Sequence, residues 1–395
     1  KKLISEAGKT KPSAQRLTDK DASWLTLIAV SVALLTVVIW LFVVGSPIAF
    51  AVTLAITVLV IACPHALGLA IPTVSTIATR LAVKNGLFIK DMAKLEVAKN
   101  ATYVVFDKTG TLTKGEFGVY EITVNVGNKN DLLSIAGSLE SHSSHVIGQS
   151  IVKYAKDNKA KFKTVSNVKN IAGRGIEGKI DGKKYFVGRH GSIPVAVVLG
   201  EKVLGEIVLS DKVKPESKIA IKELHEIGLN VAMLTGDSED VAKEVSEKLN
   251  IDTYFAQVLP KDKYKHIKSL QDEGNIVVMV GDGVNDAPAL TQANVGVAVG
   301  AGTDVAVEAG DVVLTSSNPQ DVVSFIKLSK KVYSKMIQNL FWALGYNVIA
   351  IPAAAGLFIP FGFRLTPAVG AILMSLSSVV VVVNALTLRR VKPSS

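Results

Sequence analysis

The sequence predicts a multi-domain membrane protein, with α-helical transmembrane spans and a cytoplasmic α/β domain that carries an inserted α+β domain. Mean hydropathy is +0.36 although 20% of the residues are charged, which fits a membrane part joined to a soluble part. Apolar stretches of about 20 residues, the length that crosses a bilayer core, form a pair at each end of the chain. Between the pairs, short apolar runs alternate with amphipathic helical patterns.

The apolar stretches cover residues 24–44, 48 to beyond 72, 340–358 and 367–388. Basic residues precede the first stretch, at Lys1, Lys2, Lys9, Lys11 and Arg16. Further lysines and arginines flank the other outer ends, whereas the short connections within the pairs carry only Arg364. The positive-inside rule therefore predicts that both termini and the central region are cytoplasmic.

Composition excludes several classes of protein. Cys63 is the single cysteine, so no intrachain disulfide framework can form. The net charge is +10, but lysine is spread along the chain rather than clustered with aromatic residues, so we expect lipid and not nucleic acid as a partner. The chain opens with Lys1 and shows no signal-peptide pattern, and we expect it to be a piece of a longer protein.

The central region has the pattern of a parallel sheet covered on both faces. Four nearly continuous apolar runs each end in Gly, Asp or both, at residues 101–107, 229–237, 275–283 and 295–300. In open α/β sheets, ligands bind at the carboxyl ends of the strands, where these polar residues gather. Residues 120–204 break this rhythm with alternating strands and glycine, which indicates a second domain inserted into the first.

The stretch VVFDKTGTLTKG, residues 104–115, carries the most chemical information. Asp107 ends a strand, and the turn after it sets its carboxylate beside backbone N–H and hydroxyl donors. Such a carboxylate can attack a phosphoryl group while the donors and Mg²⁺ take up the charge, giving an aspartyl-phosphate. No GxxxxGK[ST] loop occurs, so ATP must be bound in another way.

The segment DKTGTLT matches the phosphorylation signature of P-type ATPases, and the chain resembles their heavy-metal-transporting branch over nearly its whole length. The resemblance implies a HAD-like phosphorylation domain. Its further motifs follow in order as MLTGD (233–237), LPKDK (259–263) and VGDGVNDAPAL (280–290). It implies that Thr235 and Gly236 hold the transferred phosphoryl group and that Lys263 supplies a fixed positive charge.

The resemblance also implies a Mg²⁺ site formed by Asp107, Asp282 and the Thr109 carbonyl. These are the hard oxygen ligands that Mg²⁺ prefers. The rest of the catalytic set is Lys108, Asp237, Asn285 and Asp286. A phosphatase of this fold usually carries a second acid two residues after its nucleophile; Thr109 stands there, which favours a longer-lived phosphoenzyme.

The inserted domain looks like the small nucleotide-binding domain of the same branch. The family pattern of Glu, Ser-x-His-Pro, Gly-x-Gly and a later Gly maps onto Glu140, Ser143, His145, Gly173, Gly175 and Gly188. Glycine lets a backbone approach a ligand closely. Val146 stands where the family has proline, and the alternative that His145 is an ordinary surface histidine stays open.

The second span is interrupted by Cys63, Pro64 and His65. Ionisable residues inside spans are costly and usually functional, and proline breaks the helical ladder, so Cys63 and His65 can share one cavity. Cysteine and histidine are ligands for soft and borderline metals. Later spans add Tyr346, Asn347, Met374 and Ser378 as candidate ligands, while helix packing remains an alternative for Met374, Ser377 and Asn384.

The Cys-Pro-His triplet looks like that of the copper- and silver-exporting subclass. The resemblance then implies ATP-driven export of Cu⁺, Cu²⁺ or silver, with ATP and Mg²⁺ as cofactors, across a prokaryotic plasma membrane. A zinc, cadmium or cobalt pump, a membrane-anchored HAD-type phosphatase and a metal-binding module with an idle ATPase remain alternatives. No Thr-Gly-Glu loop occurs, so we expect the actuator domain and first transmembrane helices of the same protein as missing partners.

These patterns divide the chain into five segments. The first, 1–89, holds the N-terminal flank and two transmembrane helices, and the last, 336–395, holds two more and a tail. The phosphorylation domain is expected in two parts, 90–119 and 205–335, around the nucleotide-binding domain at 120–204.

Overall fold

The computed structural model describes residues 13–390, except residues 172, 192, 283–284 and 301–307. The N-terminal lysines expected before the first span lie outside the described residues. The chain forms two compact units. One holds the membrane helices and the phosphorylation sheet, within Lys1–Asp107, Glu216–Ser238 and Ser246–Ser395. The other, Lys108–Pro215 with Glu239–Val245, holds the nucleotide domain.

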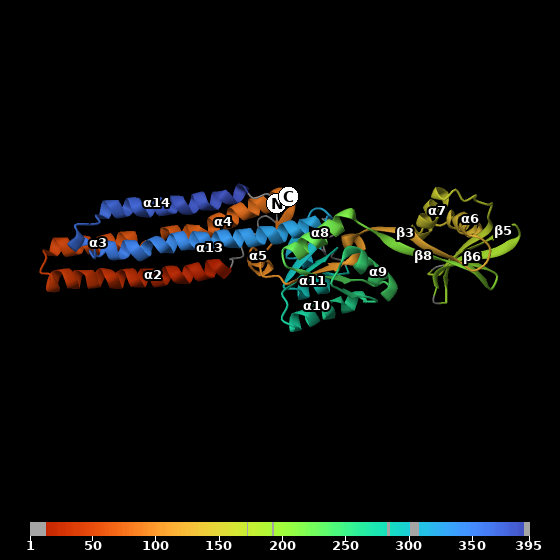
Figure 1. Ribbon diagram of the computed structural model, residues 1–395, viewed down its shortest axis with the longest axis horizontal. Coiled ribbons are helices and arrows are strands. Elements are labelled where there is room, and N and C mark those ends of the chain that lie inside the picture. Colours follow the sequence, from red (N-terminus) through yellow and green to blue (C-terminus); the bar gives the residue numbers. More distant parts are fainter. Residues whose placement is uncertain (1–12, 172, 192, 283–284, 301–307, 391–395) are drawn as a thin grey trace. The chain divides into compact units, whose positions relative to one another are not determined.

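The membrane part is a bundle of long antiparallel helices (Figure 1). Its helices are α2 (Ser13–Val38), continued by the π-helical turn Ile39–Val43, α3 (Ile48–Ile61), α4 (His65–Lys84), the second half of α13 (Gln320–Ala354) and α14 (Pro367–Leu386). Short 3₁₀ turns, Ile359–Phe361 and Thr387–Arg390, lie on either side of α14. Alanines are frequent among the buried residues where α2, α3 and α13 meet, and small side chains let helices approach closely in lipid.

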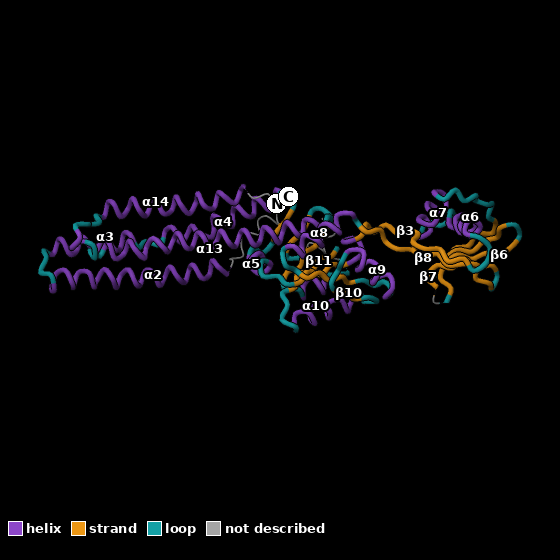
Figure 2. The backbone as a smooth tube through the Cα atoms, in the orientation of Figure 1, coloured by secondary structure: helices purple, strands orange, loops and turns teal. Residues whose placement is uncertain are grey.

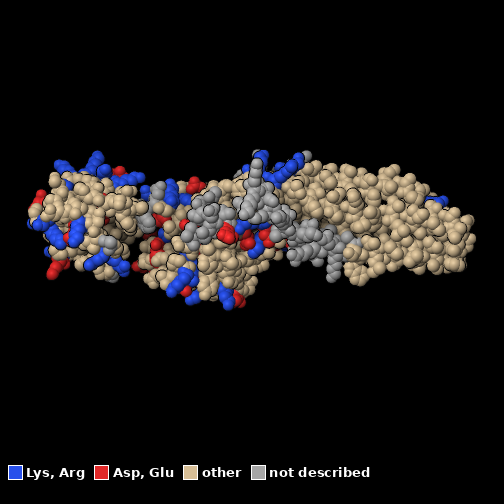
Figure 3. Space-filling view, turned by 180° about the vertical axis from the view of Figure 1, so that it is seen from behind, with Lys and Arg blue, Asp and Glu red and all other residues tan. Residues whose placement is uncertain are grey.

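Three segments of the described chain are long and apolar enough to cross a membrane: Ser23–Val43, Ile48–Lys84 and Pro367–Arg389. The other expected span, residues 340–358, forms the second half of α13 and its following turn and is not among these three. Figure 3 shows very few charged side chains on this face of the membrane helices, whereas groups of Lys, Arg, Asp and Glu are scattered over the rest of the face. The predicted combination of membrane-type helices with separate α/β and α+β domains is confirmed.

The phosphorylation domain is built on a seven-stranded sheet with the order β1-β13-β12-β11-β2-β9-β10. The strands are β1 (Leu87–Ile89), β2 (Tyr103–Asp107), β9 (Asn230–Leu234), β10 (Thr253–Phe255), β11 (Val277–Gly281), β12 (Val295–Val299) and β13 (Val312–Leu314). All neighbouring strands are parallel except β1 and β13. The four apolar runs are therefore parallel strands as predicted.

Helices flank this sheet (Figure 2). They are α5 (Ala93–Ala98), α8 (Pro215–Glu226), α9 (Glu239–Leu249), α10 (Lys263–Asp272), which follows the 3₁₀ turn Pro260–Asp262, and α11 (Ala287–Gln292). Every residue of β11 and β12 is buried, because helices cover both faces of the central strands. Since β2, β9 and β11 are parallel, their carboxyl ends meet at one edge of the sheet.

The nucleotide domain is an antiparallel sheet with the order β3-β8-β7-β6-β5-β4 and two helices. The strands are β3 (Thr113–Val124), β4 (Ser166–Ile171), β5 (Gly175–Ile180), β6 (Lys183–His190), β7 (Ile193–Leu199) and β8 (Lys202–Val213). Helices α6 (Lys129–Glu140) and α7 (Val146–Asp157) contribute Leu132, Leu139 and Ile151 to its core. The sheet extends beyond the predicted limits of 120–204, because β3 and β8 form one long ribbon.

Candidate functional site

The candidate phosphorylation centre lies where the parallel strands end. Asp107 is the last residue of β2 and pairs in register with Leu234, the last residue of β9, so Thr235 follows beside it. On the other side of β2, Phe106 pairs with Val280, so Gly281 and Asp282 follow beside Asp107. The sheet therefore brings the predicted motifs at Asp107, Thr235 and Asp282 to one edge.

Lys263 joins two carboxylates at this edge. Its Nζ lies 2.6 Å from Asp107 Oδ1 and 2.6 Å from Asp286 Oδ1, and all three side chains are almost fully buried. Burial raises the pKa of Asp107 to about 7; the nearby Asp286 charge adds to this rise and the Lys263 ammonium opposes it. Burial alone would lower the pKa of Lys263, but the two carboxylates outweigh it and raise that pKa.

Asp286 and Asp282 supply further oxygen atoms. Asp286 Oδ2 is buried and makes no hydrogen bond to any described residue. A Cβ at position 281 would lie 2.3 Å from that oxygen, so only glycine leaves room for it. Asp282 is exposed but close enough for its charge to raise the pKa of Asp107. Carboxylate oxygens of this kind are the hard ligands that Mg²⁺ prefers, although the described side chains do not form a preassembled group of three acidic ligands.

The turn after Asp107, Lys108–Leu112, has a fixed backbone geometry. Thr109 at φ −75° and ψ 125°, followed by Gly110 at φ 76° and ψ −18°, matches a type II turn, which needs glycine at its second central position. Lys214 Nζ donates to the carbonyls of Gly110 at 2.8 Å and Thr111 at 2.9 Å. The sequence analysis did not identify Lys214. The sequence marks it only as a basic residue directly after β8, the strand that returns to this turn.

The remaining predicted catalytic residues belong to the same three motifs and differ in how exposed their side chains are. Thr235 is buried directly after β9, and its Oγ1 accepts a hydrogen bond from the Asp237 N–H at 3.1 Å. Gly236 and Asn285 are exposed, and Lys108 is 2% exposed. A buried, ordered Thr235 next to an exposed Gly236 backbone is suited to donate hydrogen bonds to an anion at the strand end.

A cavity of about 640 Å³ opens in the nucleotide domain. All six residues predicted to bind nucleotide line it: Glu140, Ser143, His145, Gly173, Gly175 and Gly188. Arg174 and Arg189 line it too and were missed, although Arg174 lies between two of the predicted glycines. The cavity therefore offers one carboxyl group, one imidazole and two guanidinium groups to a ligand.

Two glycines shape the cavity wall. Gly175 on β5 and Gly188 on β6 are paired, with φ of +151° and +147°, which L side chains rarely adopt. A Cβ on Gly175 would lie 2.1 Å from the Val187 carbonyl oxygen, and a Cβ on Gly188 would lie 2.1 Å from that of Arg174. The two backbones can approach this closely only without side chains.

Glu140 and His145 are held by α7. A Cβ on Gly148 would lie 2.2 Å from Glu140 Oε2, so the glycine admits the carboxyl group. Burial raises the pKa of Glu140 to about 7, against a hydrogen bond with Ser143 that lowers it. His145 Nδ1 accepts from the Ile147 N–H at 3.3 Å and so caps α7. Val146, in place of the family's proline, is the first residue of that helix, where either residue is tolerated.

The membrane candidates surround a break in the second span. Helix α3 ends at Ile61 and α4 begins at His65, so the span is broken at the triplet. Cys63 and His65 are both exposed. The Tyr346 hydroxyl donates to the Ile61 carbonyl at 2.6 Å, and thereby satisfies a carbonyl at the end of α3.

The other membrane candidates lie on α13 and α14. Asn347 is 4% exposed; its Nδ2 donates to the Ala343 carbonyl at 3.2 Å, and its Oδ1 has no partner among the described residues. On α14, Ser378 donates to the Met374 carbonyl at 3.3 Å. The described residues contain no cluster of three or more His, Cys, Asp or Glu side chains that could hold a metal. A site at Cys63 and His65 would therefore need thioether, amide or hydroxyl ligands.

Comparison with known proteins identifies the family. Residues 102–294 match the model of haloacid dehalogenase-like hydrolases. The chain is 46% identical over 98% of its length to copper-exporting P-type ATPase B of Archaeoglobus fulgidus, and 42% identical over 98% to the probable copper-transporting P-type ATPase B of Staphylococcus aureus. The solved catalytic domain of the CPx-ATPase CopB-B is 35% identical, with a TM-score of 0.52, and 97% of it is covered by 64% of this chain. The chain belongs to the heavy-metal-transporting P-type ATPases.

The likeness extends to the membrane helices. A zinc-transporting PIB-type ATPase in the E2.Pi state matches with a TM-score of 0.83 and 31% identity, over 98% of this chain and 66% of that one. The chain spans about three fifths of the length of the curated relatives, 59% of the Archaeoglobus protein and 61% of the Staphylococcus one.

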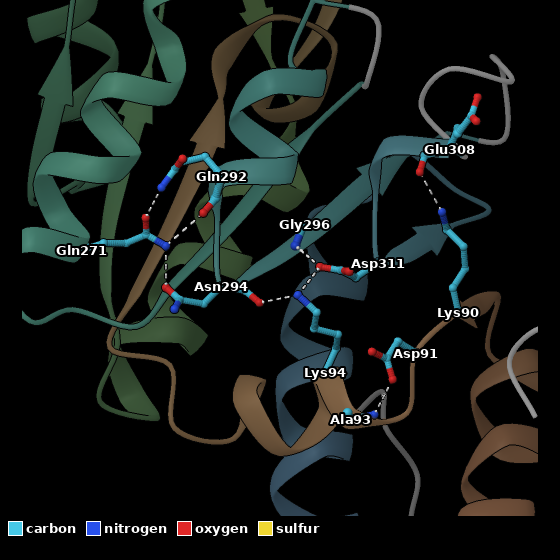
Figure 4. A network of polar contacts seen from close by, with 10 residues as sticks. All are labelled: Lys90, Asp91, Ala93, Lys94, Gln271, Gln292, Asn294, Gly296, Glu308 and Asp311. Carbon is cyan, nitrogen blue, oxygen red and sulfur yellow. Dashed lines mark hydrogen bonds and ion pairs between the residues drawn. The ribbon is translucent and has the colours of Figure 1, made fainter. Parts of the chain in front are cut away.

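In this P-type ATPase chain, a polar network ties the segment after α4 to the phosphorylation sheet (Figure 4). Lys94 on α5 lies 3.1 Å from Asp311 Oδ2 and donates to the Asn294 carbonyl at 2.9 Å. The same Asp311 oxygen accepts the Gly296 N–H at 2.9 Å. The chain that leaves the Cys63 and His65 region through α4 is thus anchored beside β12 and β13.

Proposed function

We propose that this chain is the catalytic and metal-binding part of an ATP-driven pump that exports copper or silver ions through an aspartyl-phosphate at Asp107. The observation that carries the proposal is the coexistence of two sites in one chain. A membrane span broken at Cys63 and His65 presents soft-metal ligands, and the buried Asp107–Lys263–Asp286 set presents a nucleophile with its counter-charge.

The chemistry assigned to Asp107 is attack on the γ-phosphorus of ATP. One carboxylate oxygen forms the new P–O bond, the bond to the β-phosphate oxygen breaks, and ADP leaves. Lys263 holds Oδ1 at 2.6 Å, which leaves Oδ2 for attack. Mg²⁺, held by Asp107, Asp282 and the Thr109 carbonyl, would neutralise phosphate charge. Thr235 and Gly236 are then the donors that receive the transferred phosphoryl oxygens.

We assign ATP to the nucleotide-domain cavity. A volume of about 640 Å³ falls within the range of small-molecule pockets, which is about 300–1,000 Å³. Glu140 in its carboxylate form can accept from the adenine amino group, and the His145 ring can stack on the base. The paired glycines at positions 175 and 188, which line the cavity, would give ATP a wall without side chains at those two positions.

The transported ion is assigned from the ligand types. A Cys63 thiolate, a His65 imidazole and a Met374 thioether favour Cu⁺, Ag⁺ or Cu²⁺ on grounds of softness. The unpaired Asn347 Oδ1 and the Ser378 hydroxyl could complete the set. Zinc is the second candidate, because Cys and His also serve zinc and a zinc-transporting pump matches the fold with a TM-score of 0.83.

We further propose that the catalytic units and both termini of this segment face the cytoplasm of a prokaryotic cell. Basic residues at the ends of the membrane helices nearest the phosphorylation sheet support this orientation, among them Arg80, Lys84 and Lys335. Family membership implies an actuator domain and additional transmembrane helices. The actuator domain would complete the cycle by directing water to the phosphoenzyme.

Trapping from labelled ATP tests the aspartyl-phosphate. We expect an acid-stable, hydroxylamine-sensitive label that requires Mg²⁺ and is absent in Asp107→Asn. Asp282→Asn should retain nucleotide binding but lose most of the label. Label that persists in Asp107→Asn would show that another residue is phosphorylated.

Metal-stimulated phosphorylation by the membrane-embedded protein tests the cargo. Cu⁺, Cu²⁺, Ag⁺ and Zn²⁺ are compared in the wild type, Cys63→Ala and His65→Ala. We expect stimulation by copper and silver that both variants lose. Stimulation by Zn²⁺ alone would support the zinc pump, and equal stimulation in the variants would remove the triplet from the transport site.

A further inference from the structure

A continuous chain of hydrogen bonds joins three membrane helices away from the candidate metal ligands. Lys335 Nζ on α13 donates to Asn384 Oδ1 on α14 at 3.0 Å. Asn384 Nδ2 donates to Asn339 Oδ1 on α13 at 2.8 Å. Asn339 Nδ2 donates to the Ala70 carbonyl on α4 at 2.9 Å. Each amide thus uses its oxygen toward one neighbour and its nitrogen toward the next.

The central member of this chain is completely buried. Asn339 is 0% exposed, and Asn384 is half-buried. Polar side chains inside a helix bundle are costly unless they are hydrogen-bonded, and here every bond crosses from one helix to another. Apolar contacts between helices in lipid do little to fix their axial positions, because lipid tails are equally apolar. A buried asparagine that pairs with one partner sets the register between helices.

The network lies at a similar distance from the candidate metal ligands on all three helices. Asn339 precedes Tyr346 by seven residues on α13, Asn384 follows Ser378 by six on α14, and Ala70 follows His65 by five on α4. At 1.5 Å per residue this separation is about 8–10 Å, always toward the phosphorylation sheet. Apolar residues of the same helices, Ala66, Leu67, Ala343 and Val381, form a buried cluster between the two layers.

The same stretch of α13 continues into the phosphorylation domain. Lys327 pairs with Glu223 on α8 at 2.5 Å, and Lys330 donates to the Ile227 carbonyl at 3.1 Å. Tyr333 carries the Lys99 ammonium 3.6 Å above its ring. Lys335 lies two residues after Tyr333 on the same helix, and its amine donates to Gln338 of α13 and to Asn384 of α14.

We propose that Asn339 and Asn384, with Lys335, are positioning residues for the membrane metal site. They fix the register of α4, α13 and α14, so that the ligands on these three helices converge on one ion. This inference rests on the proposed transport function. Loss of the network lets the helices slide, which weakens metal binding without removing any ligand.

The test uses the membrane-embedded protein and Cu⁺ under reducing conditions. The variants are Asn339→Leu and Asn384→Leu, which keep approximate size, and Asn339→Gln, which keeps both polar groups. Ser375→Ala on α14 is the matched control, because Ser375 is exposed and, among the residues that the structure describes, bonds only to Ala371 of its own helix. The readouts are the Cu⁺ concentration for half-maximal phosphorylation of Asp107, the maximal phosphoenzyme level and the dissociation constant of ADP.

We expect each leucine variant to need about tenfold more Cu⁺, because each substitution removes hydrogen bonds that join neighbouring helices. The maximal phosphoenzyme level and ADP affinity should stay within about twofold, Asn339→Gln should recover part of the loss, and Ser375→Ala should match the wild type. An unchanged Cu⁺ requirement in both leucine variants would overturn the positioning role. A parallel loss of all readouts would overturn it too, since that indicates general destabilisation. A wild type without any metal dependence would instead refute the transport function, and this inference with it.

Discussion

Replacing Lys263 by methionine tests the charge balance of the phosphorylation centre. Lys263 Nζ lies 2.6 Å from one oxygen of Asp107 and 2.6 Å from one of Asp286, with the three side chains 9%, 8% and 1% exposed. At an effective dielectric of about 20, each contact of 2.6 Å corresponds to about 6 kcal/mol of attraction, much of which offsets the desolvation of the charges. Removing one partner of a buried pair costs about 3–5 kcal/mol. We expect Lys263→Met to lower the free energy of unfolding of the phosphorylation domain by about that amount.

The measurement is urea unfolding followed by brief proteolysis. Tryptophan fluorescence would not report on this domain, because all three tryptophans lie on membrane helices, at Trp24, Trp40 and Trp342. Lys265→Met is the matched control. Lys265 makes an equally short 2.6 Å contact, with Asp262, but it is 62% exposed, so its loss should have no measurable effect.

A second variant isolates the electrostatic cause. In Lys263→Met with Asp286→Asn, one of the two stranded carboxylates is removed, and part of the lost stability should return. The reasoning fails if Lys263→Met costs less than about 1 kcal/mol, a value typical of exposed pairs, or if the double variant is no more stable than the single one.

Three further changes probe the rest of the site. Gly188→Ala puts a Cβ 2.1 Å from the Arg174 carbonyl oxygen, at a strain of about 1–3 kcal/mol, and should weaken ADP binding measured by calorimetry at least about tenfold. The control is Gly182→Ala, which also has a positive φ of +76° but open space around it, and it should leave ADP affinity unchanged. Because burial raises the pKa of Glu140 to about 7, its carboxylate is lost as the pH falls through 7, so ADP affinity should drop about tenfold from pH 8 to pH 6, and a profile as flat as that of Glu140→Gln would contradict this role. Lys214→Met removes the amine that binds the carbonyls of Gly110 and Thr111, so the turn after Asp107 loses its support. The rate of phosphorylation measured by rapid quench should then fall about tenfold or more while ADP affinity is retained. An equal loss of both would indicate unfolding of the domain.

Parts of the fold and site are predictable because they depend on local patterns. The apolar runs ending at Asp107, Thr235 and Asp282 predict parallel strands, and parallel strands place their carboxyl ends together. Pro64 predicts a break in the second span, and α3 does end at Ile61. The glycines at positions 175 and 188 were predicted to let the backbone approach a ligand, and the structure shows that they also let the paired strands β5 and β6 approach each other.

The contacts that adjust these groups depend on how distant elements pack. Lys263 lies 156 positions from Asp107 in sequence, and only the placement of α10 beside β2 puts its amine on that carboxylate. Tyr346 was expected as a metal ligand from its place in the middle of a span, but the packing of α13 on α3 directs its hydroxyl to the Ile61 carbonyl. The sequence left open whether Asn384 binds metal or packs against a neighbouring helix. Its hydrogen bond to Asn339 forms only because α14 lies beside α13.

The sequence by itself determined the class of protein and predicted which residues would carry its chemistry, because strand-end aspartates, a Cys-Pro-His break and apolar spans are properties of short segments. Only the tertiary structure decided how those residues are charged, oriented and supported. Burial of Asp107 and Glu140, the shared amine of Lys263 and the amide chain through Asn339 arise between segments far apart in sequence. Their energies depend on distances of a few ångströms, and only the packing of helices and strands sets those distances.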